Sequence, residues 1–289
     1  MRRRLLATLA IAVLGATTGC GTTTEGTQPS SAPDAYPQKI VSLSPTATEM
    51  LFAIGAGPQV VAVDEFSNYP AGVPKTDLSG FTPNAEAIAA KTPDLVVLSG
   101  DNKGIVAQLT NLKIKTQLAP PAKTIEDTYS QIKELGDVTG HAKEAEALNK
   151  KIKDDLAALL KDLPKRAKPL TYFYEVDPAP YAATSKTFSG SLLGSAGLVN
   201  VADSAALADS EYPKMSAEAV IKANPDIIFL ADTVMGESAE KVKARPGWSA
   251  MTAVSKGQIF TLDSDIASRW GPRVVDLMRA MVDAVRQAQ

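Results

Sequence analysis

Two glutamates, Glu86 and Glu218, recur in the same local setting in the two halves of the chain. Each stands near the start of a short helical pattern and precedes a Pro-Asp pair that ends in Asp94 or Asp226. A carboxylate at such a point could simply complement the positive end of the helix dipole. Because the setting is repeated, the pair could instead offer equivalent anionic contacts to a partner built from two identical chains. The residue types leave both interpretations open.

A second group consists of aromatic side chains that fall in predicted loops rather than at periodic core positions. Aromatic residues make up only 6% of the chain, so their presence in loops is informative. Aromatic faces could cover the apolar area of a flat macrocycle, and each such side chain buries about 150–250 Å². Each could also anchor its own loop to its own lobe. The group comprises Phe66, Phe81, Tyr181, Tyr212 and Trp270.

Charged residues surround Trp270 near the end of the chain. Arg269 could donate hydrogen bonds to an amide or carboxylate edge of a ligand, with Asp265 close by in the sequence. Arg273 lies within the last helical pattern and is expected to be structural. An arginine and an aspartate at this spacing also commonly form a local ion pair. We therefore predict Asp265, Arg269 and Trp270 at a ligand site, with the local ion pair as the alternative.

The motifs of the common enzyme classes are absent. The sequence has no G-x-S-x-G, H-E-x-x-H or Walker motif, and Gly55-Ala-Gly57 lacks the third glycine of a dinucleotide fingerprint. One histidine and one cysteine offer few ligands for a soft metal and no disulfide scaffold. A net charge of −2 without a basic block gives no electrostatic footprint for nucleic acid. We expect no catalysis, no bound metal, no resident cofactor and no nucleic-acid partner.

The elements that must position these residues are present twice. Residues 84–98, NAEAIAAKTPDLVVL, and 216–230, SAEAVIKANPDIIFL, each contain a short amphipathic helix, a Pro-Asp break and an aliphatic run suited to a buried parallel strand. Strands and helices alternate through both halves, which predicts an α/β fold with two Rossmann-like lobes and parallel-rich sheets. Open parallel sheets bind ligands beyond the carboxyl ends of their strands. We therefore expect the ligand cleft between the lobes.

One helical segment separates the two lobes. Residues 124–163 are helical in pattern apart from two glycines, and we predict them to be the connecting helix. The N-terminal lobe would then comprise residues 38–123 and the C-terminal lobe residues 164–289. The second part of the connector, residues 141–163, would alone span about 35 Å. A single stiff helix predicts only modest lobe closure.

The amino end has the form of a secretory signal. Residues 1–19 contain three arginines, an apolar stretch and small residues directly before Cys20. An uncleaved membrane anchor would need about 18 or more apolar residues, and the segment is shorter than that. Residues 20–37 contain little apolar surface, which predicts a flexible tether. Removal of residues 1–19 would leave 27 basic and 32 acidic residues, a net charge of −5.

Several segments in a fixed order resemble the helical-backbone (class III) periplasmic substrate-binding proteins of ABC importers. They are KIVSLSPTATEMLFAIGAGPQVVAVDEFSNYP, NAEAIAAKTPDLVVLSG, EYPKMSAEAVIKANPDIIFL and SDIASRWGPRVVDLMRAMVDAV. The resemblance covers residues 38–287 and implies cobalamin (vitamin B12), a ferric siderophore or haem as the ligand. It is nearest to the cobalamin-binding members, chiefly through EFSNYP, EYPKMSAE and SDIASRWGPR.

The resemblance also implies roles for single residues at the cleft. Phe66, Phe81 and Tyr212 match family positions that line the cobalamin pocket, whereas Ser99 stands where an aromatic residue occurs in some members. Base-on cobalamin needs no protein ligand to its cobalt, so a missing histidine does not argue against it. A haem carrier could use Tyr181 or Tyr212.

Contacts with the membrane and the transporter follow from the same resemblance. In the family, acids at the positions of Glu86 and Glu218 meet arginines on the two permease subunits. Cys20 matches the lipidated cysteine of the bacterial lipobox, although Thr17 stands where that motif usually has leucine. Multiple acyl chains hold a protein stably on a membrane. We expect a monomeric, lipid-anchored receptor on the extracytoplasmic face of the cell membrane.

The predicted function is capture of cobalamin or a related corrinoid and its delivery to an ABC permease dimer with its ATPase subunits. A ferric siderophore or haem receptor of the same class is the alternative. A cell-envelope hydrolase that uses carboxylates is the alternative from a different class.

Overall fold

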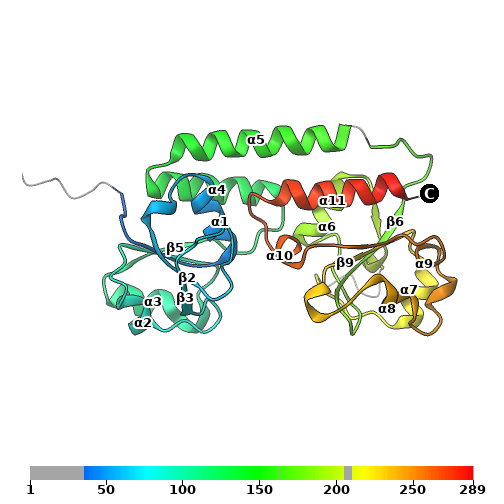
Figure 1. Ribbon diagram of the computed structural model, residues 1–289, viewed down its shortest axis with the longest axis horizontal. Helices are drawn as coiled ribbons and strands as arrows, with labels where there is room; N and C mark the ends of the chain where they lie inside the picture. The colour runs from blue at the N-terminus through cyan, green and yellow to red at the C-terminus, as the bar shows by residue number, and fades with distance from the viewer. Residues whose placement is uncertain (1–35, 162, 205–209, 289) are drawn as a thin grey trace, which may run out of the picture. The chain divides into compact units, whose positions relative to one another are not determined.

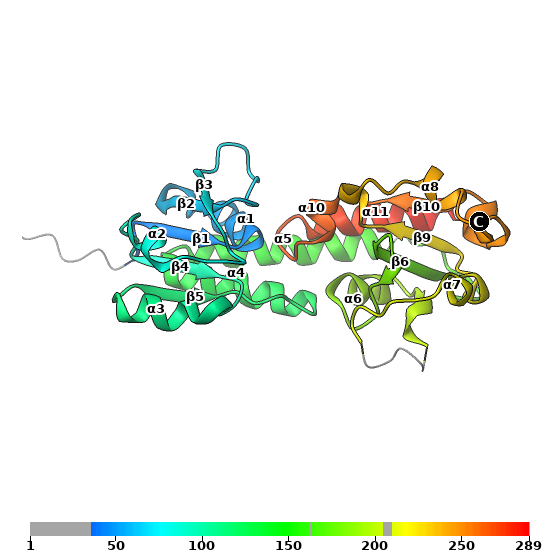
Figure 2. The same ribbon diagram turned by 90° about the horizontal axis from the view of Figure 1, so that it is seen from below.

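The computed structural model describes residues 36–161, 163–204 and 210–288, all within one unit, Ala35–Gln289. These residues form two separate five-stranded sheets with helices on both faces of each (Figures 1 and 2). The predicted α/β fold with two parallel-rich sheets is confirmed. Among the residues described, no helix combines the length and apolar character needed to cross a membrane.

The first sheet is parallel throughout and has the strand order β3-β2-β1-β4-β5. Its strands are β1 (Ile40–Leu43), β2 (Val60–Asp64), β3 (Lys75–Leu78), β4 (Leu95–Leu98) and β5 (Lys115–Leu118). Every residue of β1 and β4 is buried, and alternate side chains face opposite layers. Ile40 packs toward α1 (Pro45–Ala53) and α4 (Ile125–Thr139), and Val41 packs toward α2 (Ala85–Ala89) and α3 (Ile105–Asn111).

The second sheet has the order β10-β9-β6-β7, and β8 pairs with β6; only the β6–β7 pair is antiparallel. The strands are β6 (Thr171–Asp177), β7 (Tyr181–Ala182), β8 (Val199–Asn200), β9 (Ile227–Leu230) and β10 (Ile259–Thr261). The helices around the sheet are α6 (Phe188–Ser195), α7 (Ala217–Ala223), α8 (Ala239–Lys243), α9 (Thr252–Ser255), α10 (Ser264–Ala267) and α11 (Val274–Gln287).

The repeated Pro-Asp break performs the same task in both sheets. The Asp94 carboxylate accepts hydrogen bonds from the backbone N–H groups of Gln38 and Lys39, both at 2.9 Å. The Asp226 carboxylate accepts from the backbone N–H and the hydroxyl of Thr171, both at 2.8 Å. Each aspartate precedes one central strand and ties it to the start of the neighbouring strand, which explains why the sequence repeats here.

The predicted connecting helix, residues 124–163, is two helices rather than one. Thr124 and Asp127 form a capping box at the start of α4, and the chain turns back at Gly140, where φ is +83°. This left-handed conformation suits glycine. The second helix, α5 (Ala142–Lys161), has 20 residues and runs along both α4 and α11. Only α5 therefore corresponds to the stiff connector expected from the sequence, whereas α4 packs against α1.

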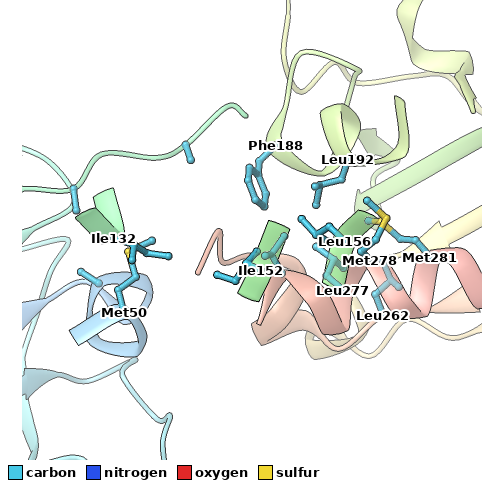
Figure 3. Close-up of a cluster of buried hydrophobic side chains, with 14 of the residues drawn as sticks. Met50, Ile132, Ile152, Leu156, Phe188, Leu192, Leu262, Leu277, Met278 and Met281 are labelled. Atoms are coloured by element: carbon cyan, nitrogen blue, oxygen red, sulfur yellow. The ribbon is translucent and has the colours of Figure 1, made fainter. Parts of the chain in front are cut away.

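One apolar cluster lies beneath α5 and joins the two halves. Figure 3 shows Ile152 and Leu156 of α5 close to Leu277 and Met278 of α11, with Phe188 and Leu192 of α6 nearby. Met50 of α1 and Ile132 of α4 belong to the same cluster toward the first sheet. Helix α5 is thus packed along its apolar face against both halves of the protein and does not stand free between them.

Candidate functional site

Exposed aromatic rings lie beyond the carboxyl ends of the first sheet. Phe66 follows β2 and Phe81 follows β3, and their ring centroids are 5.8 Å apart in an edge-to-face arrangement. Both rings are exposed, Phe81 to 71%. Ser99 follows β4 and is partly buried. The parallel strands place all three positions beyond the carboxyl ends of one sheet, the edge at which open parallel sheets bind ligands.

Two tyrosines lie close together in sequence-distant segments of the second half. Tyr181 in β7 pairs as a bridge with Lys214, whose Nζ lies 5.7 Å from the centre of the tyrosine ring. Tyr212 stands two residues before Lys214, and both tyrosines are exposed. Partial desolvation of the phenol, followed by the nearby Glu211 carboxylate, raises the pKa of Tyr212. Tyr212 is therefore neutral at ordinary pH and offers an apolar ring with a hydroxyl donor.

Arg269 has a different role from the one expected. It is 8% exposed, and its Nη1 donates to Glu49 Oε1 at 2.8 Å and to Asn68 Oδ1 at 2.9 Å. Its Nη2 donates to the Phe66 carbonyl at 3.1 Å and to Asp265 Oδ1 at 3.0 Å. The terminal N–H groups are thus all engaged by the protein. Arg269 does not present a donor to a ligand; it fixes the backbone beneath the Phe66 ring.

Glu49 is the residue that sequence reasoning missed. Its side chain is 2% exposed and also accepts hydrogen bonds from Arg273, at 2.9 Å from Nε and 2.5 Å from Nη2. The hydrogen bonds to Glu49 raise the pKa of Arg273. One buried carboxylate of α1 therefore holds two arginines from the end of the chain. The only signal in the sequence was that Glu49 is the single charged residue of α1, and this did not indicate its partners.

Asp265 belongs to this ion-pair network and remains half-exposed. It accepts from Asn68 Nδ2 at 2.6 Å and from Arg269, so it links a loop of the first half to the segment after β10. The predicted local ion pair is present. Asp265 is the one member of the pair that still faces solvent.

Trp270, which we predicted at the ligand site, is hydrogen-bonded to α4. Its indole N–H donates to Gln131 Oε1 at 2.9 Å, and its carbonyl accepts from the Thr128 hydroxyl at 2.8 Å. The ring is partly buried against the apolar cluster beneath α5. Trp270 therefore joins the segment before α11 to α4.

The two repeated glutamates occupy equivalent positions. Glu86 lies in the first turn of α2, capped by Asn84, and Glu218 lies in the first turn of α7, capped by Ser216. Both side chains are exposed, and neither forms an ion pair within the part of the chain that the structure describes. The pKa of Glu218 is lowered by hydrogen bonds from its own backbone N–H and from the Ser216 hydroxyl. Figure 1 places α2 and α7 on the side away from α5.

Some predicted sites are not represented. Cys20 and the signal segment, residues 1–19, lie outside the described residues. Across residues 36–161, 163–204 and 210–288, no group of three or more His, Cys, Asp or Glu side chains is placed to hold a metal ion.

Two parallel-rich sheets joined by one crossing helix, with apolar rings at the strand ends, define a binding protein of the helical-backbone class. The chain belongs to the periplasmic binding protein family, whose family model matches residues 40–266. Members of this class III family are extracytoplasmic substrate-binding proteins that work with ABC importers and bind ligands of the metal-chelate type. They are transport proteins rather than enzymes.

Individual relatives extend over nearly the whole chain. The chain is 32% identical over 262 residues to the uncharacterized ABC transporter substrate-binding lipoprotein YvrC of Bacillus subtilis, covering 86% of this chain and 80% of that protein. It is 28% identical over 268 residues to a cobalamin-binding protein of Halobacterium salinarum, covering 87% of this chain and 70% of that protein. A solved structure described as a possible iron-binding (periplasmic solute-binding) protein of Staphylococcus epidermidis is similar with a TM-score of 0.74 and 29% identity, covering 86% and 98% of the two chains.

Proposed function

We propose that this protein binds cobalamin or a related corrinoid and delivers it to an ABC importer. The observation that carries the proposal is the edge-to-face pair of exposed rings, Phe66 and Phe81, beyond the carboxyl ends of β2 and β3. Exposed aromatic rings leave apolar area in contact with water, and a large flat ligand removes that area on binding. Tyr181 and Tyr212 add rings of the same kind on the second half.

The described residues contain no group of three or more His, Cys, Asp or Glu side chains placed to hold a metal ion. This composition is compatible with a ligand that carries its own chelated metal. Base-on cobalamin fills the coordination sites of its cobalt without the protein. The similarity to a cobalamin-binding protein over 87% of this chain supports the same choice.

A ferric siderophore or haem is the second candidate, because Tyr181 and Tyr212 present phenols that could approach a ferric ion. The similarity to a possible iron-binding protein supports this candidate. Either phenol would have to lose its proton to ligate iron well, whereas base-on cobalamin needs no protein ligand. We therefore rank this candidate second.

Delivery would use the paired acids and a lipid anchor. Glu86 and Glu218 are free to contact arginines on the two subunits of a permease dimer that works with its ATPase subunits. Close interfacial charge pairs have shown couplings of about 1.5–7 kcal/mol, enough to orient docking. Lipidated Cys20 would hold the protein at the membrane, and the similarity to a substrate-binding lipoprotein supports this part of the proposal.

A titration series tests the proposal directly. The chain without residues 1–19 would be titrated with cyanocobalamin, haem and a ferric siderophore, with binding measured by absorbance and by equilibrium dialysis. We expect stoichiometric, saturable binding of cyanocobalamin and weaker binding of the other two. Tight binding of haem or the siderophore alone would replace the first candidate with the second, and no binding of any probe would refute both.

A further inference from the structure

A buried carboxyl group without a donor lies at the carboxyl end of the second sheet. Asp232 follows β9 and is 1% exposed. Neither of its carboxyl oxygens meets an N–H or O–H donor within the described part of the chain. A buried ionised carboxylate without a donor or a cation is strongly destabilising. Asp232 therefore needs a proton of its own in the folded protein.

The groups around Asp232 show where that proton is shared. The carboxylates of Glu175, in β6, and Glu237, just before α8, both act on the charge of Asp232. The one cation of the cluster, Arg245, is already bound to both glutamates, at 2.7 and 2.5 Å from the Glu175 oxygens and 2.8 Å from Glu237. The arginine also lies 4.5 Å from the centre of the Trp248 ring, which holds it in place.

The charge balance of this cluster is unequal. Three carboxyl groups face a single guanidinium, so a fully ionised cluster would carry two uncompensated negative charges. Burial first, and then the Glu175 charge, raise the pKa of Asp232 to about 7. A proton on Asp232 would reduce this excess to one charge while Glu175 keeps both hydrogen bonds from Arg245.

The carboxyl pair supports an exposed apolar turn. Asp232 directly precedes the turn η5 (Thr233–Met235) and closes it, because its carbonyl accepts from the Met235 N–H at 2.8 Å. Val234 and Met235 are 80% and 56% exposed. The Ser264 hydroxyl, beyond β10, bonds the Thr233 hydroxyl at 2.8 Å and the Val234 N–H at 3.2 Å. The turn thus lies at the carboxyl ends of β9 and β10, the edge where parallel sheets bind ligands.

We propose that Glu175 and Asp232 share one proton and that this shared proton holds the Thr233–Met235 turn in place as part of the ligand site. The turn offers Val234 and Met235 to an apolar face of the ligand, and Asp232 acts as a positioning residue beneath them. Loss of the proton places two carboxylates side by side in the interior. Their repulsion is relieved when Asp232 moves toward water and displaces the turn. Ligand affinity then falls as the pH rises; this part rests on the proposed function.

The test uses Asp232→Asn, which keeps the shape of the side chain and offers Glu175 a permanent N–H donor. Asp283→Asn, at an exposed aspartate of α11 paired only with Arg286, is the matched control. The ligand-free readout is the thermal unfolding midpoint across a pH series from about 5 to about 9. The wild type and the control should lose stability as the pH rises toward about 7, the value to which the Asp232 pKa is raised. Asp232→Asn should show a clearly flatter profile, and identical profiles for all three proteins would overturn the shared proton.

The second readout is cyanocobalamin and haem binding at about pH 5.5 and about pH 8.5. The wild type should bind several-fold more weakly at the higher pH, and Asp232→Asn should bind equally at both. Met235→Gln should weaken binding at both values without changing the unfolding profile. The positioning role of Asp232 would be overturned if the unfolding profile of the wild type depends on pH but its ligand affinity does not. Failure of the wild type to bind either probe would count against the proposed function, while the unfolding profile still decides on the proton.

Discussion

Glu49 and Arg269 lie 220 positions apart in the chain, and Glu49 Oε1 accepts from Arg269 Nη1 at 2.8 Å in the interior. Glu49 belongs to α1 beside the first sheet, whereas Arg269 follows the last strand of the second sheet. The ion pair therefore joins the two halves directly, and Arg273 adds a bidentate contact to the same carboxylate. The two halves are therefore joined by these buried ion pairs as well as by the apolar cluster under α5.

Glu49→Gln should destabilise the folded protein by about 3–5 kcal/mol, because removal of one partner leaves buried guanidinium charge uncompensated. Chemical denaturation measures the loss. Glu240→Gln is the control, because its ion pair with Lys243 is exposed and should contribute about 0–1 kcal/mol. A change of similar size in both variants would show that the buried network is not a stabilising junction.

Phe81→Ala should weaken cyanocobalamin binding by about 1–2 kcal/mol, or about 5- to 30-fold, and leave the unfolding free energy nearly unchanged. The side chain is 71% exposed, so its removal creates no cavity in the folded protein. Leu112→Ala removes an apolar side chain that is 50% exposed, at the carboxyl end of α3, and should bind normally. Titration by equilibrium dialysis compares the two, and equal affinity would remove Phe81 from the site.

Glu86→Ala combined with Glu218→Ala should abolish ligand uptake by whole cells while the purified protein keeps its ligand affinity. The two carboxylates are exposed and unpaired in the described residues, so the fold does not depend on them. Glu144→Ala combined with Glu146→Ala, on the exposed face of α5, removes the same charge from a different surface. Normal uptake by the first double variant would exclude the docking role.

Trp270→Phe should cost about 1–3 kcal/mol of stability, because the buried Gln131 carbonyl loses its donor. Ligand affinity should change little. Denaturation of this variant, of Gln131→Ala and of the double variant forms a cycle that isolates the hydrogen bond. A loss of affinity without a loss of stability would return Trp270 to the ligand site.

The unfolding free energy of the wild type should be highest at mildly acidic pH. Burial raises the folded-state pKa of Asp64 and Asp232 above the ordinary 3.8. The unfolded chain loses these protons first, so stability falls as the pH rises toward about 7. The backbone N–H of Lys123 lowers the pKa of Asp127, and the pKa of Glu218 is lowered as well. Their contributions to stability are therefore complete above 3.8 and 4.5 and are lost as the pH falls below these values. A calorimetric series that shows stability rising steadily from mildly acidic to alkaline pH would contradict this account.

Local signals in the sequence were sufficient for most of the fold. The aliphatic runs of β1, β4 and β9, the Ser44 cap of α1 and the repeated Pro-Asp breaks each depend on neighbouring residues, and the structure confirms the α/β elements they predicted. Strand β3 has the sequence KTDL, which lacks an apolar pattern; it exists because it pairs along the edge of β2.

Long-range partners could not be predicted in the same way. Arg269 has the residue type of a ligand contact, and only the folded chain shows that Glu49, Asn68 and the Phe66 carbonyl use its donors. The partner of the Trp270 indole could not be predicted for the same reason, since Gln131 lies on a helix 139 positions earlier in the sequence. The sequence predicted which residues follow the strands. It could not predict which of these side chains are used by the protein itself and which remain free for a ligand.

The packing of α11 against α5 bears on how the chain folds during synthesis. Val274–Gln287 is the final helix, and its Leu277 and Met278 complete the apolar cluster that also includes Met50 and Ile132 (Figure 3). This late helix is thus required to seal an apolar layer to which α1 also contributes. A fragment that stops before residue 274 would expose that layer to water, so the amino-terminal half is expected to aggregate when it is made alone.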